Sequence, residues 1–334
     1  MPEISSLVHD YFYSYPEVDE YYNGDFRNLA AFQKQTEKIE LSQLSRKRLT
    51  AILKEQNLDY GCGRKTLDNI DQLAQDQTCA VVTGQQVGLF SGPLYTIYKS
   101  LTAIKLSEYL NENANGCYVP IFWLASDDHD FAEIDHIKLL NKDNRVEEIR
   151  YQSLSSKTKI PASKILLTSE ISRCIQLLKD LTPDTEFKLE ILIHLSEAYT
   201  SGRLFSEAFA KWMTQLFKSF GLIFIDASHP GLKDLGKRIF FHEISKNSPS
   251  TLKAMEASEK LKQDKYKSQI QLREGRLNLF FTEQERLTIQ FDDEHYRIKG
   301  SPKTYKRDEL LALVEKKPHL FSPNVLLRPI YQDG

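Results

Sequence analysis

CAVVTGQQVGLFSGPLYTIYKSLTAIKLSEYL, residues 79–110, joins a short apolar run to a long segment with apolar residues at helical spacing. Three glycines, two glutamines and a proline separate the two parts. A buried strand, a glycine-rich turn and a helix make up a βα unit. The stretch therefore predicts a strand at residues 80–84 and a helix from about Pro93 to Asn111.

The same order returns further along the chain. YVPIFWLA (118–125) predicts a second strand, and the acidic turn SDDHDFAEIDHI follows it directly. GLIFID (221–226) predicts a third strand, and a segment with helical periodicity at 206–220 precedes it. Strands that alternate with helices form parallel sheets. We therefore expect an α/β fold around a parallel sheet.

Four regions follow from these patterns in the first three quarters of the chain. The polar, helix-leaning start predicts an N-terminal helical region, and the two core parts are separated by a segment that departs from the βα order. The regions are the helical start at 1–78, the first half of the core at 79–145, an excursion at 146–200 and the core continuation at 201–247.

In the last quarter of the chain the spacing of apolar residues changes to a period of two. Two helical segments, around Leu232 to Lys246 and Leu252 to Lys262, precede three short alternating stretches, LNLFFTE, RLTIQFD and HYRIKG, and these stretches predict a β-meander within residues 248–320. A last helix is expected at Arg307 to Glu315. In residues 321–334 the stretch NVLLRPIY has the pattern of a further core strand just before the chain stops. We therefore expect a truncated product.

The bulk composition excludes several classes of protein. Of 334 residues, 41% are hydrophobic and 27% charged, with a net charge of −2, which is typical of ordinary globular proteins and gives no electrostatic case for nucleic acid or membrane surfaces. No apolar run approaches the ~20 residues of a membrane span, and the start lacks signal-peptide features. The four cysteines have no CxxC spacing. We expect a cytoplasmic protein without a zinc site.

The turn TGQQVGLFSGP, residues 83–93, lies where open α/β sheets bind ligands, beyond the carboxyl end of a strand. Its glycines permit close backbone approach, Ser91 or Gly92 is a candidate helix cap, and the N–H groups of the helix start form an anion site. Gln85 and Gln86 suit a hydroxyl-rich or carboxylate-bearing ligand. The spacing matches no phosphate-loop motif, and the alternative is a tight turn with solvated glutamines.

Asp127, Asp128, His129 and Asp130 crowd the end of the second strand. Like charges repel unless a cation, a proton or a ligand compensates them, so this cluster is a functional candidate. The alternative is an aspartate cap with a charged first helical turn. Asp226 occupies the equivalent place after the third strand, and the three strand ends together indicate one polar rim.

A continuing helix after the second strand would place His129, Glu133 and His136 on one face, a geometry that can hold a divalent metal. HxxxExxH is not a recognised zinc motif. We therefore expect no metal site here.

Four blocks together resemble one family. TGQQVGLFSGPLYTIYK, VPIFWLASDDHDFAEIDHI, GLIFIDASHP and SPNVLLRPIYQ agree in order and spacing with the BshC family, the cysteine ligases of bacillithiol biosynthesis. The start YSYPEVDEYYNGDF agrees as well, so the resemblance spans nearly the whole chain. Family members continue well past the point equivalent to Gln332, which puts full activity of this chain in question.

The resemblance implies a fold and a reaction. It implies a Rossmann-like core related to class I aminoacyl-tRNA synthetases and nucleotidyltransferases, with connecting-peptide insertions at the excursion and the meander, and a coiled coil that mediates homodimers in full-length members. The implied reaction joins the carboxyl group of L-cysteine to the amine of glucosaminyl malate, with ATP as the cofactor that the synthetase analogy suggests. The segment Gly92 to Tyr95 takes the place of the synthetase signature, without its histidines.

Roles for single residues follow as hypotheses. The amides of Gln85, Gln86, Gly92 and Leu94 bind carboxylate or phosphate oxygens of an activated cysteine. Asp128 or His129 orients the attacking amine and takes its proton. The remaining candidates for substrate binding are Ser91, Tyr95, Asp127 and Asp226. Two alternatives are a truncated chain that binds ligand or assembles without turnover, and a metal-dependent hydrolase that uses the Asp/His cluster.

Overall fold

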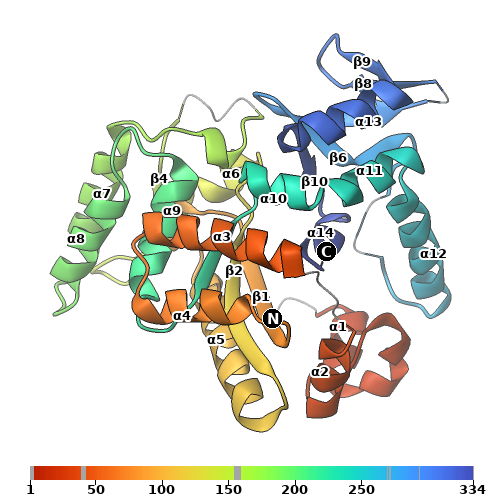
Figure 1. Cartoon of the computed structure of the whole chain (residues 1–334). Helices are drawn as coiled ribbons and strands as arrows, with labels where there is room; N and C mark the ends of the chain where they lie inside the picture. Colours follow the sequence, from red (N-terminus) through yellow and green to blue (C-terminus); the bar gives the residue numbers. More distant parts are fainter. Residues whose placement is uncertain are drawn as a thin grey trace.

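The core of the computed structural model is a three-stranded parallel sheet (Figure 1). The structure describes residues 4–38, 43–153, 159–268, 270, 272–292 and 294–333. The strand order is β1-β2-β5, and the strands are β1 (Thr78–Gln85), β2 (Cys117–Leu124) and β5 (Ile223–Asp226). All three predicted strands are therefore confirmed, and the fold is the α/β class that the sequence predicts.

The central strand β2 is buried on both faces, as expected for a parallel sheet. Phe122 and Leu124 pack on one side with helices α5 (Tyr95–Asn113) and α9 (Phe205–Leu216). Ile121 and Trp123 pack on the other side with α3 (Gln43–Asp59) and α4 (Arg64–Leu73). The strand therefore joins two hydrophobic cores, and its side-chain alternation assigns neighbouring residues to opposite ones.

The segment between β2 and α9 forms a small unit on one flank of the core (Figure 1). Its described residues form a hairpin, three α-helices and a 3-10 turn: α6 (Phe131–Ile134), β3 (His136–Leu140), β4 (Val146–Arg150), the 3-10 turn η5 (Ala162–Lys164), α7 (Glu170–Leu181) and α8 (Lys188–Ala198). Residues after β5 continue as α10 (Pro230–Leu235), α11 (Lys237–Ser245) and α12 (Pro249–Gln263).

A second, antiparallel sheet follows α12. Its order is β10-β6-β7-β8-β9, and it includes the three predicted meander strands. The elements are β6 (Arg276–Thr282), β7 (Arg286–Phe291), β8 (His295–Ile298), β9 (Thr304–Lys306), α13 (Arg307–Lys316), η6 (Pro318–Leu320) and β10 (Phe321–Pro323).

The expected core strand at NVLLRPIY is wrong. Only Phe321–Pro323 is a strand, and it pairs antiparallel with β6 in the second sheet. Asn324 then accepts backbone hydrogen bonds from Leu326 and Leu327 through Oδ1, and α14 (Arg328–Asp333) begins. An asparagine that bonds backbone N–H groups two and three residues on favours a turn over extended chain. The division of the chain into six regions otherwise stays a prediction.

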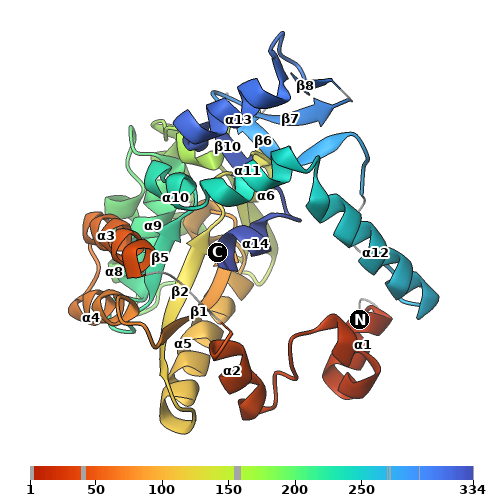
Figure 2. The same ribbon diagram turned by 45° about the vertical axis from the view of Figure 1, so that its right-hand side comes forward.

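The N-terminal segment contacts α12 with its first part (Figure 2) and packs its last helix against β1 and β2, where Thr36 Oγ1 lies 3.1 Å from the hydroxyl oxygen of Tyr118. It contains α1 (Ser6–Tyr13), the 3-10 turns η1 (Tyr15–Glu17) and η2 (Asp19–Tyr21), and α2 (Leu29–Thr36). Glu20 pairs with Lys260, and the hydroxyl group of Tyr266 donates to Asp10 at 2.9 Å. Across the described residues, no helix combines the length and hydrophobicity that a membrane crossing requires.

Candidate functional site

A cleft of about 880 Å³ opens at the carboxyl ends of β1 and β2. The second sheet and α14 close its other side. Its wall consists of Val82, Thr83, Gly84, Gln85, Gln86, Lys99, Trp123, Ala125, Asp128, Phe280, Arg286, Asn324, Val325, Arg328 and Gln332. The glutamine turn and the acidic turn therefore face one cavity, as the position of both turns after parallel strands predicts.

Hydrogen bonds fix the glutamine side of the cleft. Gln85 Nε2 donates to the hydroxyl oxygen of Tyr95 at 3.0 Å, and Gln86 Nε2 donates to Glu133 Oε2 at 2.7 Å. Lys99 Nζ donates to the carbonyl oxygen of Gly84 at 2.6 Å and to Gln85 Oε1 at 3.2 Å. Partial burial lowers the pKa of Lys99. The glutamines are thus held in place and are not the freely solvated side chains of the alternative interpretation.

Close backbone packing explains why this turn needs glycine. A Cβ on Gly84 would lie 2.6 Å from the carbonyl oxygen of Trp123 on the neighbouring strand. A Cβ on Gly88 would lie 2.8 Å from Cα of Gly92, which has a φ of +69°. Only glycine tolerates both the approach and the conformation.

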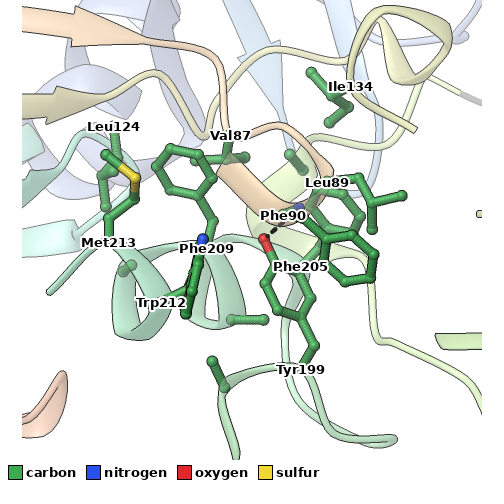
Figure 3. Packing of buried hydrophobic residues seen from close by; sticks show 14 of the residues in the cluster. Val87, Leu89, Phe90, Leu124, Ile134, Tyr199, Phe205, Phe209, Trp212 and Met213 are labelled. Atoms are coloured by element: carbon green, nitrogen blue, oxygen red, sulfur yellow. Dashed lines mark hydrogen bonds between the residues drawn. The ribbon is translucent and has the colours of Figure 1, made fainter. Parts of the chain in front are cut away.

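The hydrophobic core supports the glycine- and glutamine-containing turn through Tyr199. The backbone N–H of Phe90, a residue with a φ of 49°, donates to the hydroxyl oxygen of Tyr199 at 3.0 Å. Figure 3 shows this bond among side chains of α9, including Phe205, Phe209 and Trp212. A left-handed phenylalanine costs free energy and persists where its surroundings hold it. The hydrophobic core and the cleft wall are therefore mechanically connected at Phe90.

Asp128 is the anionic centre of the cleft. Its Oδ1 accepts hydrogen bonds from Arg286 Nη1 at 2.9 Å and from Arg328 Nη2 at 2.7 Å. Two guanidinium groups thus compensate the charge that the acidic turn brings to this strand end. Neither arginine is near Asp128 in sequence, so the pairing depends on the second sheet and on α14.

Arg286 is almost fully buried, with 5% of its side chain exposed. Besides Asp128, its guanidinium donates to Ser322 Oγ at 3.0 Å and to the carbonyl oxygen of Pro323 at 2.8 Å, and it lies 4.0 Å from the ring centre of Phe280. Burial lowers the pKa of Arg286, and the charge of Asp128 opposes this shift. The residue joins the second sheet to the acidic turn.

His129 lies behind the cleft wall, at Arg286. Its Nδ1 accepts a weak hydrogen bond from Arg286 Nη1 at 3.4 Å, which leaves the ring proton on Nε2. Burial lowers the pKa of His129, and the charge of Arg286 lowers it further. The geometry makes His129 a neighbour of the ion pair and gives it no place in the cleft wall.

Asp127 and Asp226 are buried beneath the cleft and do not line it. Asp127 Oδ2 pairs with the ammonium group of Lys233, and burial lowers the pKa of that lysine. Asp226 Oδ1 accepts hydrogen bonds from the Ser126 hydroxyl and from N and Oγ of Ser228. Burial raises the pKa of Asp226. Both carboxyl groups bond to neighbouring residues at the strand ends. The predicted polar rim therefore forms at the ends of β1 and β2 and does not include the end of β5.

The start of α5 also lies outside the cleft wall. Ser91 has a φ of 79°, and neither it nor Gly92 caps the helix, because the cap position is Leu94 and no side chain bonds there. Leu94 is 67% exposed, and Tyr95 reaches the site only through its bond to Gln85. Of the predicted site residues, the structure gathers Gln85, Gln86 and Asp128 in the cleft.

The histidine-glutamate-histidine geometry does not form. Helix α6 ends at Ile134, and His136 already lies on β3 with its Nδ1 2.9 Å from Asp135. Glu133 is bonded to Gln86 instead. Within the described ranges no group of three or more histidine, cysteine, aspartate or glutamate side chains is arranged to hold a metal ion.

Sequence reasoning missed most of the positive charge in the cleft. Lys99 lines the cleft but is not among the predicted site residues. Arg328 lies in the block SPNVLLRPIYQ that carries the family resemblance, and that block was a usable signal. No sequence signal marks Arg286, because a single arginine at the start of an alternating strand is common and indicates no site.

Fold and cleft together define a Rossmann-like α/β protein with a polar cleft at the strand ends. The sequence matches the family described as bacillithiol biosynthesis BshC, N-terminal Rossmann-like domain, over residues 1–334. The chain belongs to this family.

Three relatives carry the name "Putative cysteine ligase BshC". Identity is 35% for the relative from Chloroherpeton thalassium, 32% for that from Salinibacter ruber and 36% for that from Chlorobaculum tepidum. The alignments cover 95%, 98% and 86% of this chain, but 56%, 60% and 52% of the relatives. The chain thus spans a little more than half the length of these relatives.

Proposed function

We propose that this chain takes part in bacillithiol biosynthesis as a ligase that joins L-cysteine to glucosaminyl malate through an amide bond. The observation that carries the proposal is the position of Asp128. Its carboxylate, held by Arg286 and Arg328, faces the fixed amides of Gln85 and Gln86 across one cleft. Family membership and the relatives' names support the cysteine ligase class.

The cleft suits an anionic ligand. Its wall contains the cations Lys99, Arg286 and Arg328 and, among the lining residues, one carboxylate, that of Asp128. Arg328 uses one N–H for Asp128, and its side chain is 24% exposed, so further donors are open to a ligand. Carboxylate and phosphate oxygens are the groups that such donors bind best.

The reaction needs activation, because a free carboxylate is a poor electrophile. The cations of the cleft fit the phosphates of a nucleotide, and Lys99 and Arg328 are the residues that would hold them. Bound ATP would supply the activation that turns a carboxyl oxygen of cysteine into a leaving group. The amide C–N bond then forms as that C–O bond breaks, and the amine nitrogen loses its proton.

Asp128 is better placed than His129 to handle the amine. Asp128 lines the cleft, and its second oxygen, Oδ2, has no partner among the described residues. His129 directs its free lone pair at Arg286. A carboxylate oxygen within hydrogen-bond reach orients an ammonium group and accepts its proton. We therefore assign orientation of the amine to Asp128, and binding of carboxylate or phosphate oxygens to Gln85 and Gln86.

Product formation tests the proposal. The 334-residue chain, L-cysteine, glucosaminyl malate and ATP are incubated together, and the cysteinyl amide product is measured by mass spectrometry. We expect product from the wild type, about 100-fold less from Asp128→Asn, within the range of lost acid–base catalysis, and wild-type amounts from the control Tyr98→Phe. Tyr98 is 61% exposed and lies outside the cleft wall.

The same experiment separates the inactive alternative. A chain that shows a thermal shift with glucosaminyl malate but forms no product binds ligand without turnover. Product at the wild-type rate from Asp128→Asn would remove the role assigned to Asp128 and leave the ligase class standing.

A further inference from the structure

A second cavity of about 280 Å³ adjoins the cleft. The two share Phe280, Asn324 and Val325 as a common wall. The second cavity is lined by residues of α12, β6 and β7, by Ile270, Leu272 and Arg273, and by the turn after β10. A ligand that fills both cavities would pass Asn324, and its ends would meet different chemistry.

The polar wall of the second cavity is built on a buried network. Glu243, 1% exposed, accepts hydrogen bonds at Oε1 from Ser248 and Ser250 at 2.7 Å and from Asn278 Nδ2 at 3.1 Å. Asn278 Oδ1 in turn accepts from Asn324 Nδ2 at 2.7 Å. A satisfied buried network holds its members in one orientation. The amide of Asn324 at the shared wall is therefore preorganised.

Two arginines add positive charge to the second cavity. Arg273 and Arg276 both line it, and within the described parts of the chain neither guanidinium has an ion-pair or hydrogen-bond partner. Thr251 adds a hydroxyl group, and Asn278 adds an amide. Guanidinium groups together with hydroxyl and amide groups match a ligand that carries both carboxylate and hydroxyl oxygens.

We propose that this second cavity binds the carboxylate-bearing end of the hydroxylated acceptor. This inference rests on the proposed function. Arg273 and Arg276 hold the carboxylates of the malate unit, and the sugar spans the shared wall at Phe280 and Asn324. The amine then enters the larger cleft, where Asp128 lies. The acceptor and the activated amino acid thereby occupy adjoining cavities. Specificity for the acceptor lies in the region of the antiparallel sheet and not in the parallel sheet.

Calorimetric titration of the 334-residue chain tests the inference. The probes are glucosaminyl malate and methyl glucosaminide, which lacks the two carboxylates. The variants are the double substitution Arg273→Gln with Arg276→Gln, which removes the charges, and Thr288→Phe, which fills the second cavity without touching the cleft wall. The matched control is Arg145→Gln, an exposed arginine in the turn between β3 and β4.

The expected result is at least a tenfold loss of affinity for glucosaminyl malate in the double variant, since charge-assisted hydrogen bonds are lost. Methyl glucosaminide is expected to bind the wild type and the double variant with equal affinity. Thr288→Phe is expected to lose affinity for glucosaminyl malate, and Arg145→Gln is expected to keep wild-type affinity. Thermal melts verify that each variant is folded.

Two failures are distinguishable. In the first, the double variant or Thr288→Phe binds glucosaminyl malate with wild-type affinity while Asp128→Asn forms less product than the wild type. That result overturns the role of the second cavity and keeps the proposed function. No binding of glucosaminyl malate to the wild type overturns both.

Discussion

Arg328 Nη2 donates to Asp128 Oδ1 at 2.7 Å, although the two residues are separated by 200 positions in the sequence. Asp128 follows a strand of the parallel sheet, and Arg328 begins the last described helix. The contact therefore closes the cleft between the first βα unit and the end of the chain. Because Arg328 is partly exposed and Asp128 keeps its second arginine, the contact affects ligand binding more than stability.

Arg328→Gln is predicted to weaken ligand binding with little effect on stability. One charge-assisted donor to an anionic ligand is worth about 1.5–3 kcal/mol, so the loss in affinity is tenfold or more. Titration with glucosaminyl malate and with ATP measures it, and a thermal melt follows stability. Arg297→Gln is the control, because Arg297 pairs with Asp292 at the surface. Equal losses in both variants would mean that only general charge matters.

Arg286→Met is predicted to destabilise the fold itself. The substitution leaves Asp128, Ser322 and the carbonyl oxygen of Pro323 without their shared donor. Removal of one partner of a buried ion pair typically costs about 3–5 kcal/mol. Urea denaturation gives the free energy of unfolding. Lys105→Gln breaks an exposed pair with Glu108 on α5 and is expected to change it by less than about 1 kcal/mol.

The fold could be predicted from the sequence where the signal was local. The strands β1, β2 and β5 are short apolar runs with polar turns behind them, and their positions follow from those patterns. NVLLRPIY was misread because its apolar alternation resembles a strand, whereas the turn depends on one side chain, that of Asn324. A single capping interaction outweighed the periodicity.

The site could be predicted only in part. Gln85, Gln86 and Asp128 lie directly after strands, and parallel sheets bring such positions together. Arg286 reaches the site by pairing within a second sheet whose placement against the first no local pattern encodes. Asp226 has the position of a site residue, but neighbouring serines satisfy its Oδ1 beneath the cleft. Position after a strand thus selects candidates, and tertiary packing decides among them.

Tyr199→Phe is predicted to loosen the glutamine turn. The substitution leaves the buried N–H of Phe90 without its partner, which costs about 1–3 kcal/mol. Because Phe90 holds a left-handed conformation, the lost bond acts on the loop that positions Gln85 and Gln86. Hydrogen exchange at the Phe90 amide is expected to accelerate, while Tyr98→Phe leaves it unchanged. Unchanged exchange in Tyr199→Phe would show that packing alone holds the turn.

His129 makes stability fall on the acidic side of neutrality. Burial and Arg286 lower its pKa from the ordinary value near 6.5, so the unfolded chain binds this proton more readily than the folded one. The contribution of His129 is complete above about pH 6.5 and is lost as the pH falls toward the lowered pKa. His129→Asn removes the proton site and is predicted to flatten this part of the pH profile.

Urea denaturation at about pH 7.5 and about pH 5.5 measures the effect, since the two values bracket the ordinary pKa. The decrease in the free energy of unfolding between them is expected to be smaller in His129→Asn than in the wild type. His319→Asn, at an exposed position, is the matched control. Identical decreases in wild type and His129→Asn would show that Arg286 and burial do not act on His129 in this way, because a lowered pKa in the folded state requires a difference in bound protons.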